Sequence, residues 1–445
     1  MKLDGAQVVV VGMARSGVAA AELLREQGAR VRTVDQVSMS IPGFNIEPQS
    51  DISFADADLI VLSPGVPPDL DVIENARRRG VRIVGDLELA SWFLEGDIIG
   101  ITGANGKTTT TALTGHILAA SGVRAQVGGN IGIAGKSPAS MVKTSRPGQW
   151  NVLELSSFQL ETTETFRAHI GAALNVTPDH LDRHHTLEKY AEAKARLFVN
   201  QRAGDFAVLN GDDPVCASFA GRGRGTPVWF SSTREVSAGA FLRNDCIFLD
   251  GEPLMKAAEV PLRGLHNLEN TMAAAAMARL AGVGHAQIRQ AVMTFPGVEH
   301  RLEFVRELDG VTWYNDSKAT NVDATLKAIA AFPGGLWVIL GGKDKNSDYS
   351  PLAEPLRARA HGALLIGAAA AKIEAQLHGA VPFIRRETIE AAVTEAHLRA
   401  KPGDTVLLAP ACASFDQFEN FEHRGREFKR LVRELQTSRE SGWQG

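Results

Sequence analysis

The sequence predicts an α/β protein of three domains, and three observations lead to this class. Short runs of β-branched residues alternate with helical patterns along the chain, which is typical of parallel sheets covered by helices. The length of 445 residues suggests about three domains. Hydrophobic residues make up 44% of the chain and charged residues 22%, which is enough apolar material for several cores.

Charge and cysteine content argue against several classes of protein. The formal net charge is −4 with both signs mixed, so we expect neither a nucleic acid nor a membrane surface as the main partner. The three cysteines are scattered and odd in number, which fits a reducing compartment and provides no disulfide or zinc framework. The first residues predict a strand and not a signal peptide, and no apolar run approaches about 18 residues. We expect a cytoplasmic protein without membrane insertion, acting as a monomer.

The first predicted domain, residues 1–96, begins with a βαβ unit. A valine strand at residues 8–11 and a GMARSG turn precede a helix, and the next strand, RVRTVD, ends at Asp35. An acid about 20 residues beyond such a turn is typical of dinucleotide-binding folds. Ala14 stands where the middle glycine of G-x-G-x-x-G would let the backbone approach a pyrophosphate, which disfavours a nicotinamide cofactor. A nucleotide held at the helix start stays open, and LIVLSPGVPP (59–68) predicts a strand with a rigid ligand-binding loop.

The second predicted domain, residues 97–297, opens with DIIGIT, a strand, and KTTTTALTGHILAASG, a helix closed by Gly122. The GANGKTT turn between them is the setting of a phosphate-binding loop, although its spacing differs from the common G-x-x-x-x-G-K-[ST]. Backbone N–H groups would face the phosphates and Lys107 would add a positive charge. Thr108 or Thr109 could hold Mg²⁺. The alternative is an ordinary strand-to-helix turn with a surface lysine.

Polar residues follow two further predicted strands, WNVLEL and IGAALNV. Glu154 ends the first strand and is followed by Ser156 and Gln159, and His180 comes shortly after the second. Because ligands gather at the carboxyl ends of strands in an open α/β sheet, a carboxylate and an imidazole there could carry a metal. Taken alone, His180 would be a capping or core histidine, and Lys194 in TLEKYAEAKARLF would be a solvated helix lysine.

The third predicted domain, residues 298–445, follows a long alanine-rich helix and a boundary at FPGVEHRLE. Strands are predicted at LWVIL, GALLIG and DTVLLA, with helices between them. The chain then ends in the predicted helix HRGREFKRLVREL and a polar tail.

Eight motifs occur in one order: GANGKTTT, ELSSFQL, NVTPDHLDRH, YAEAKARLF, HNLEN, HRLE, YNDSKATN and APACASFDQFENFEHRG. Together they resemble the Mur ligase family, which joins amino acids to a cell-wall precursor with ATP, and the likeness runs from Val8 to about Leu435. The shortened loop is similar to that family's G-x-N-G-K-T-T. The resemblance implies a Rossmann-like UDP-binding domain, a central P-loop ATP-binding domain with a mostly parallel sheet, and a C-terminal Rossmann-like domain.

The resemblance also implies the ATP and metal sites. The lysine of the family's Y-x-x-A-K-x-R motif is carbamylated by CO₂ and maps onto Lys194, so Lys107, His180 and carbamylated Lys194 would be catalytic. Two Mg²⁺ ions are implied, one near Thr108 and Glu154 and one near His180 and Lys194. The residues assigned to ATP are Gly103, Asn105, Gly106, Lys107, Thr108, Thr109, Asn267, Asn270, Arg301 and Asp316.

The same resemblance implies the two substrates that are joined, UDP-N-acetylmuramoyl-L-alanine and D-glutamate. Two lysines and two hydroxyls could hold the two carboxylates of D-glutamate. Phe415 stands where the family pattern leads us to expect leucine, and the motif of siblings that add diamino acids is absent. The residues assigned to the UDP precursor are Asp35, Asn130, Ser156 and Gln159, with the 12–17 loop at its pyrophosphate. The residues assigned to D-glutamate are Lys318, Thr320, Lys345, Ser414, Phe415 and Phe421.

The implied reaction is ATP-dependent ligation through an acyl phosphate, and it has rivals. A sibling or folylpolyglutamate-type ligase would use another amino acid, but the latter type lacks a UDP-binding first domain. A nicotinamide oxidoreductase would rest on the imperfect turn around Ala14. A nucleotide-regulated binding protein without turnover would leave the set of Glu154, His180 and Lys194 unexplained.

Overall fold

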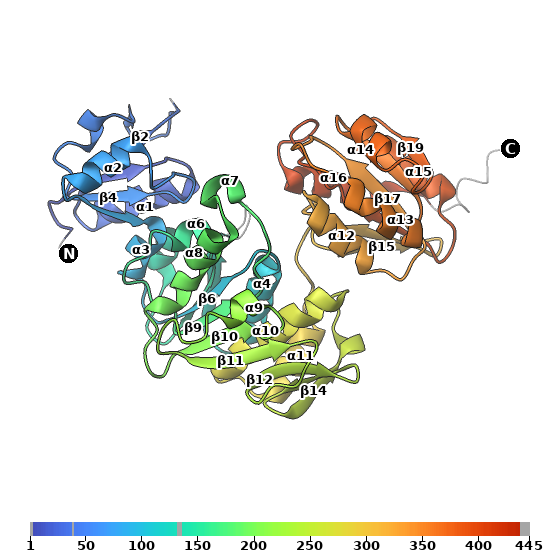
Figure 1. Ribbon diagram of the computed structural model, residues 1–445, viewed down its shortest axis with the longest axis horizontal. Coiled ribbons are helices and arrows are strands. Elements are labelled where there is room, and N and C mark those ends of the chain that lie inside the picture. The colour runs from blue at the N-terminus through green and yellow to red at the C-terminus, as the bar shows by residue number, and fades with distance from the viewer. Residues whose placement is uncertain (1–2, 38–39, 131–135, 437–445) are drawn as a thin grey trace. The chain divides into compact units, whose positions relative to one another are not determined.

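The computed structural model describes residues 3–37, 40–130 and 136–436, and its strands form three sheets (Figure 1). The chain divides into two compact units. The first unit comprises residues 1–260 and 269–295, and the second comprises residues 261–268 and 296–445. Within the described ranges, none of the helices has both the length and the apolar character needed to span a bilayer.

The first sheet has five parallel strands in the order β3-β2-β1-β4-β5, as in a Rossmann-like fold. Successive valines of β1 face opposite sides of the sheet, so Val8 and Val10 enter one apolar core while Val9 and Val11 enter another. The elements are β1 (Gln7–Val11), α1 (Arg15–Glu26), β2 (Arg30–Asp35), β3 (Ile46–Pro48), η1 (Asp51–Phe54), β4 (Leu59–Leu62), α2 (Asp71–Arg78), β5 (Arg82–Gly85) and α3 (Asp86–Ser91).

The central sheet has nine strands in the order β14-β13-β12-β11-β10-β9-β6-β8-β7. The strands from β7 to β12 are parallel, as predicted, and two antiparallel pairings add β13 and β14 at one edge. The strands are β6 (Asp97–Thr102), β7 (Ala125–Gly129), β8 (Trp150–Glu154), β9 (Ile170–Ala173), β10 (Phe206–Asn210), β11 (Thr226–Ser231), β12 (Gly239–Arg243), β13 (Cys246–Leu249) and β14 (Glu252–Lys256).

The helices of this part of the chain include α4, which follows the GANGKTT turn, and α10, the alanine-rich segment. The predicted strand over 170–176 is shorter than expected, since β9 ends at Ala173 and Asn175 turns toward the phosphate loop. The helices are α4 (Lys107–Ala120), α5 (Pro138–Met141), η2 (Val142–Thr144), α6 (Ser157–Leu160), α7 (Leu181–His184), α8 (Leu187–Val199), α9 (Pro214–Ala217), η3 (Ala257–Glu259), α10 (Leu265–Leu280) and α11 (His285–Met293).

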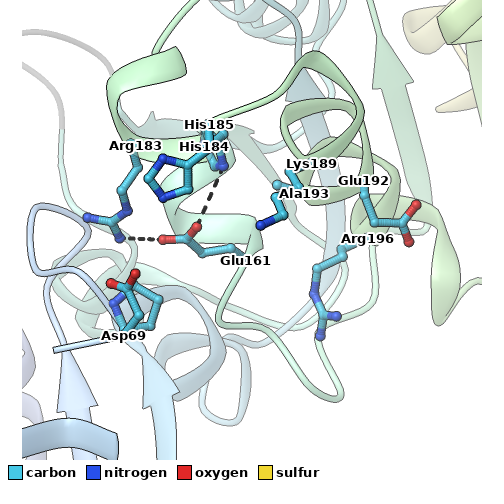
Figure 2. A pocket seen from close by; sticks show the side chains of 10 residues that line it. Asp69, Glu161, Arg183, His184, His185, Lys189, Glu192, Ala193 and Arg196 are labelled. Carbon is cyan, nitrogen blue, oxygen red and sulfur yellow. Dashed lines mark hydrogen bonds and ion pairs between the residues drawn. The ribbon is translucent and has the colours of Figure 1, made fainter. Parts of the chain in front are cut away.

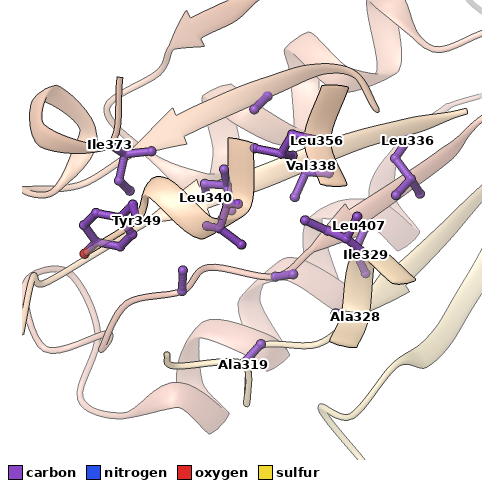
Figure 3. Packing of buried hydrophobic residues seen from close by; sticks show 14 of the residues in the cluster. Ala319, Ala328, Ile329, Leu336, Val338, Leu340, Tyr349, Leu356, Ile373 and Leu407 are labelled. Carbon is purple, nitrogen blue, oxygen red and sulfur yellow. The ribbon is translucent and has the colours of Figure 1, made fainter. Parts of the chain in front are cut away.

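The third sheet, in the second unit, has the order β15-β16-β20-β17-β18-β19, with β15 antiparallel at one edge and the other strands parallel. Apolar cores cover both faces, and Figure 3 shows the one that contains Leu340, Tyr349 and Ile373. The elements are β15 (Glu303–Leu308), β16 (Val311–Asn315), α12 (Val322–Ala330), β17 (Leu336–Gly341), η4 (Ser350–Leu352), α13 (Ala353–Arg359), β18 (Ala360–Ile366), α14 (Ala370–Gln376), β19 (Phe383–Arg385), α15 (Ile389–Arg399), β20 (Thr405–Leu408) and α16 (Phe421–Glu434).

The predicted domain boundaries fall between sheets. The 96/97 boundary lies between α3 and the first residue of β6, and the 297/298 boundary lies between the end of α11 at Met293 and the start of β15 at Glu303. The two compact units do not separate the first sheet from the second. The three-domain limits therefore stay predictions.

Candidate active site

The GANGKTT turn joins β6 to α4 and is held in shape by two asparagines from distant parts of the chain. Gly106 has a φ of 84°, and a Cβ at this position would clash with Oδ1 of Asn270, so only glycine fits. The same Oδ1 accepts a hydrogen bond from Oγ1 of Thr110 at 3.1 Å. Asn175 holds the other side of the turn, because its Oδ1 accepts from the backbone N of Asn105 at 2.8 Å. The predicted loop is thus a fixed strand-to-helix turn at the start of a long helix, where backbone N–H groups suit a phosphate.

Two lysines converge on this turn. Nζ of Lys107 donates to the carbonyl oxygens of Gly103 and Ala104, each at 2.9 Å. Nζ of Lys194, which comes from α8, donates to the same Gly103 oxygen at 2.8 Å and lies 4.3 Å from the ring centroid of Tyr190. Of the two hydroxyls assigned to Mg²⁺ and ATP, Thr109 is buried and Thr108 is half-buried in the first turn of α4.

Lys194 is the residue whose observed environment differs most from the environment that its own segment predicts. Its side chain is only 1% exposed, whereas a lone helix lysine was expected to be solvated. Burial, followed by the positive charge of Lys107, holds the pKa of Lys194 well below its usual range. This shift makes the neutral amine, which is a nucleophile, more accessible than in a solvated lysine. Helical spacing gave a signal for this burial, because Tyr190 and Phe198 lie four residues to either side on the buried face of α8.

Glu154 and Asn130 lie together at the carboxyl ends of neighbouring strands. Glu154 ends β8 and is buried, and its carbonyl oxygen accepts from the backbone N of Asn130 at 2.8 Å. Gly129, with a φ of 96°, allows this approach, since a Cβ there would clash with the same carbonyl. The pairing of β8 with β6 sets Glu154 opposite Ile101, just before the phosphate loop. The predicted metal ligand and the predicted substrate contact are thus brought to one sheet edge.

Ser156 and Gln159, both assigned to the UDP precursor, form hydrogen bonds with each other at the start of α6. Oγ of Ser156 accepts from the backbone N of Gln159 at 3.2 Å, and Oε1 of Gln159 accepts from the backbone N of Ser156 at 3.2 Å. This reciprocal pair is a capping box at the start of α6. The motif that carries the family resemblance therefore also fixes a helix end directly after Glu154.

His180 lies in a cluster of aromatic rings beside this helix. It has a φ of 51°, its side chain is exposed, and its Nε2 lies 3.5 Å from Oδ2 of Asp179. The ring meets Phe158 edge-on at 5.0 Å between centroids, and Phe158 stacks on His184 at 5.4 Å. Nε2 of His184 lies 2.9 Å from Oγ of Ser157, so His184 takes the core position and leaves His180 at the surface.

A cavity of about 320 Å³ lies next to this cluster (Figure 2). Arg183 pairs with Glu161 and donates to the carbonyl oxygen of Val66 at 3.0 Å, which ties α7 to the loop after β4. Burial raises the pKa of the Glu161 carboxyl. Residues 59–68 were predicted as a strand followed by a rigid loop, and Pro68 at the end of that loop lines this charged cavity. The lining residues are Pro68, Asp69, Glu161, Arg183, His184, His185, Lys189, Glu192, Ala193 and Arg196.

In the first sheet, Asp35 closes the turn between β1 and α1. Its Oδ2 accepts from the backbone N of Met13 at 2.6 Å, and its Oδ1 accepts from the backbone N of Val37 at 3.0 Å. Gly12 has a φ of 86°, and a Cβ at Gly17 would clash with the Gly12 carbonyl oxygen. Helix and turn thus approach closely without the middle glycine of the dinucleotide pattern.

The second unit holds the remaining predicted ATP contacts. Asp316 is buried, and burial raises its pKa to about 7, while the positive charge of nearby Arg301 opposes the rise. Asn267 is buried, and its Nδ2 donates to the carbonyl oxygen of Arg263 at 2.7 Å. Although Asn267 and Asn270 lie on one helix, α10, they belong to different compact units.

The predicted D-glutamate pocket is spread over three loops of the second unit. Lys318 lies with its Nζ 3.9 Å from the ring centroid of Phe421, and the backbone N of Thr320 donates to the Lys318 carbonyl oxygen. Ser414 is buried after β20, and Phe415 beside it is exposed. Lys345 is exposed on the loop after β17. The structure thus groups Lys318, Thr320 and Phe421.

Arg424 joins two of these loops, and sequence reasoning missed it. It is buried, and its guanidinium donates to Oγ and O of Ser317 at 3.0 and 2.9 Å. Both terminal nitrogens also donate to the carbonyl oxygen of Cys412 at 3.2 Å. Burial lowers the pKa of Arg424 to about 10, which leaves it charged at neutral pH. The loop that carries Lys318 is therefore fixed to the loop that carries Ser414.

The predicted metal ligands need a further donor. In the described ranges, no three His, Cys, Asp or Glu side chains lie close enough together to hold a metal ion. Glu154, Thr108 and His180 offer oxygen and nitrogen donors of the kinds that Mg²⁺ accepts only as part of a fuller set. Any Mg²⁺ ion here would need further oxygen donors, such as water, a phosphate or a modified side chain.

Known proteins resemble this chain in sequence and in fold. Residues 6–85 match the Mur ligase MurD-like N-terminal domain, residues 101–278 the Mur ligase middle domain, and residues 300–412 the Mur ligase glutamate ligase domain. The UDP-N-acetylmuramoylalanine–D-glutamate ligase of Solibacter usitatus is 59% identical over 98% of this chain and 99% of its own length. The protein of the same name from Koribacter versatilis is 50% identical over 98% and 99%.

Solved structures agree on the fold. The UDP-N-acetylmuramate–alanine ligase MurC of Thermotoga maritima superposes with a TM-score of 0.62. The superposition covers 96% of this chain and 99% of that one, at 19% sequence identity. At this identity the likeness supports the fold alone.

Proposed function

This chain belongs to the Mur ligase family, and we propose that it joins D-glutamate to UDP-N-acetylmuramoyl-L-alanine with ATP, as a step of peptidoglycan synthesis. One observation of the structure carries the proposal: two lysines, Lys107 and Lys194, donate to the same carbonyl oxygen of a phosphate loop. A reaction that brings a carboxylate to a triphosphate needs positive charge beside the phosphate loop, because the anions repel each other. Lys107 would supply such a charge directly, and the buried Lys194 would contribute by helping to hold a metal ion there.

ATP supplies the phosphoryl group. Its γ-phosphoryl passes to the carboxylate of the L-alanyl residue, which gives ADP and an acyl phosphate. Lys107 and the backbone N–H groups at the start of α4 would neutralise charge on the transferring oxygens. The amine of D-glutamate then attacks the acyl carbon, the C–O bond to phosphate breaks, and a proton leaves the nitrogen as the amide forms.

The residues of the candidate metal site fit Mg²⁺ if Lys194 is carbamylated. Thr108 and Glu154 would hold one ion, and His180 with the Lys194 carbamate the other. The ions would supply neutralisation of the phosphate and carboxylate charge. In carbamylation the neutral amine of Lys194 attacks CO₂ and loses one proton, giving an anionic oxygen donor. The burial of Lys194 and its lowered pKa support this step, because an ammonium cannot attack.

D-Glutamate would be held in the second unit by Lys318, Lys345, Thr320 and Ser414, with Phe421 and Phe415 beside them. Charged donors suit its two carboxylates. Asp35, Asn130, Ser156 and Gln159 are proposed to contact the UDP precursor. Asn267, Asn270, Arg301 and Asp316 are proposed to contact ATP, together with the turn residues Gly103, Asn105, Gly106 and Thr109. The proposed domains are 1–96, 97–297 and 298–445, in a monomer that works in the cytoplasm.

Phosphate release tests the proposal directly. With ATP and Mg²⁺ present, release should require both UDP-N-acetylmuramoyl-L-alanine and D-glutamate, and the product should carry one new amide. If release needs only one of the two substrates, or if a diamino acid replaces D-glutamate equally well, the proposed activity is wrong.

A further inference from the structure

The buried hydroxyl of Tyr349 contacts the loop that carries Lys345. The side chain of Tyr349 is fully buried in the apolar core of Figure 3, beside Leu340 and Ile373. Its hydroxyl donates to Oδ1 of Asp344 at 2.8 Å and lies 3.0 Å from Sγ of Cys412. The hydroxyl therefore connects the loop after β17 with the loop after β20.

Asp344 shapes the turn at whose tip Lys345 lies. Its Oδ1 also accepts from the backbone N of Ser347 at 3.2 Å, so Lys345 and Asn346 are the two residues enclosed by that bond. Asn346 has a φ of 59°, which asparagine tolerates in such turns. Oδ2 of Asp344 accepts from Nζ of Lys372 at 2.8 Å, and this lysine lowers the pKa of Asp344 to about 2. The carboxylate is thus charged at neutral pH and is a strong acceptor for the Tyr349 hydroxyl.

The other end of the bridge reaches the loop of Ser414. Cys412 is buried, and burial raises the pKa of its thiol to about 11, so it remains a thiol at neutral pH. The backbone N of Lys343 donates to the carbonyl oxygen of Ala413 at 2.9 Å, and a Cβ at Gly342 would clash with the same oxygen. The two loops therefore meet at backbone distance, and the Tyr349 hydroxyl is the side-chain contact beneath them.

We propose that Tyr349 is a positioning residue for amino-acid specificity: by joining Asp344 to Cys412 it fixes the distance between Lys345 and Ser414. The ligand class is a dicarboxylic amino acid, whose two carboxylates need donors at a set separation. This inference rests on the proposed function. Tyr349 and Asp344 lie outside the eight motifs of the family resemblance, whereas Cys412 belongs to one of them, APACASFDQFENFEHRG.

Tyr349→Phe tests the inference because it removes only the hydroxyl. The ring keeps its place in the core, and the backbone N of Tyr349 keeps its bond to Oε1 of Gln376 at 2.8 Å. We expect the KM for D-glutamate to rise about three- to tenfold, with kcat and the KM values for ATP and the UDP precursor unchanged. Thr312→Val is the matched control, since it removes a hydroxyl from the 2.7 Å pair with Thr405 near the amino-terminal ends of β16 and β20, whereas the loops of Lys345 and Ser414 follow the carboxyl ends of β17 and β20. It should leave all four constants unchanged.

The same change in a Lys345→Ala background separates the inference from the proposed function. If Tyr349 acts through Lys345, Tyr349→Phe should add less than about twofold to the KM of Lys345→Ala. A full additional rise would overturn the inference, as would an unchanged KM in Tyr349→Phe alone while Lys345→Ala raises it. If Lys345→Ala itself leaves the KM unchanged, the proposed role of Lys345 fails and the inference fails with it.

Lys372→Gln is a second variant that does not touch the core. It removes the partner of Asp344 Oδ2 from the surface of α14, and the KM for D-glutamate should rise about two- to threefold. If Tyr349→Phe does not fold, an unchanged KM in Lys372→Gln would overturn the inference by itself.

Discussion

The two units each place one lysine of the proposed sites in a different environment, buried in the first unit and exposed in the second. Lys194 in the first unit is 1% exposed, lies over the Tyr190 ring and donates to the Gly103 carbonyl oxygen. Lys345 in the second unit is exposed at the tip of a turn. Burial disfavours the ammonium form of Lys194, which fits its proposed carbamylation, whereas a solvated ammonium fits the carboxylate contact proposed for Lys345. The comparison shows that two lysines from motifs of one family lie in environments that favour different chemistry.

The units also differ in how they hold their candidate sites. The phosphate turn of the first unit is held by the side chains of Asn175 and Asn270, and Gly106 permits the close approach of Asn270. The loops of the second unit that carry the proposed D-glutamate contacts are joined by the buried side chains of Arg424 and Tyr349. Buried side chains therefore fix a single turn in the first unit, whereas in the second unit they fix separate loops to each other.

The largest effect is expected at the phosphate turn. Lys107→Ala should reduce turnover at least about 100- to 1000-fold, because a positive charge on the transferring oxygens is lost. The UDP precursor should bind as before, since its proposed contacts lie on other elements. Calorimetry with the UDP precursor measures this. Lost binding in the variant would contradict the proposed separation of the two sites.

The next effect tests the buried lysine itself. Lys194→Ala should lower turnover roughly 100-fold, because a ligand to the metal site disappears. Added short-chain carboxylic acids should restore part of the rate by replacing the carbamate. Lys256→Ala, at an exposed position of the same unit, is the control and should be neutral.

A readout without turnover sharpens this test. With ¹³C-bicarbonate, wild type and Lys256→Ala should show a carbamate carbon signal that Lys194→Ala lacks. Acidification should remove the signal, since a protonated amine cannot attack CO₂. An identical signal in all three proteins would exclude Lys194 as the site of modification.

Replacement of the exposed lysine, Lys345, should have a smaller effect that is confined to the amino-acid substrate. Lys345→Ala should raise the KM for D-glutamate about 10- to 150-fold, which corresponds to the loss of one charge-assisted contact of about 1.5–3 kcal/mol. The KM for the UDP precursor should change little. D-Glutamine, which lacks the side-chain charge, should be a poor substrate for wild type, and its disadvantage should shrink in the variant. If the variant discriminates as strongly as wild type, Lys345 does not contact the side-chain carboxylate.

The sequence predicted what short-range patterns control. The strand before Gly103, the helix after Gly106 and the βαβ unit that opens the first domain follow from residue periodicity and turn glycines within a few positions. The strands β12–β14 were not predicted, because their sequences GAFLR, CIFL and EPLMK contain only one β-branched residue, unlike the valine run of β1. The contacts that decide chemistry join distant residues: Lys194 reaches Gly103 across 91 positions, and Asn270 reaches Thr110 across 160. Pattern reasoning on one segment cannot place such partners, so the contact of Lys194 with Gly103 and the contacts that Arg424 and Tyr349 make between loops required the structure.

The smallest effect concerns two helix caps, one in each unit. Oγ of Ser156 accepts from the backbone N of Gln159, and Oγ1 of Thr388 accepts from that of Ala391, both at 3.2 Å. Removing either cap should cost about 1 kcal/mol in urea unfolding. Only Ser156 is proposed to contact the UDP precursor, so Ser156→Ala should also raise that KM two- to tenfold, while Thr388→Ala should not. Because the cap energies match, any difference between the two KM values belongs to the substrate contact. Equal KM values would mean that Ser156 serves the helix alone, and that the ELSSFQL motif contributes to this site through Glu154 and the position of α6.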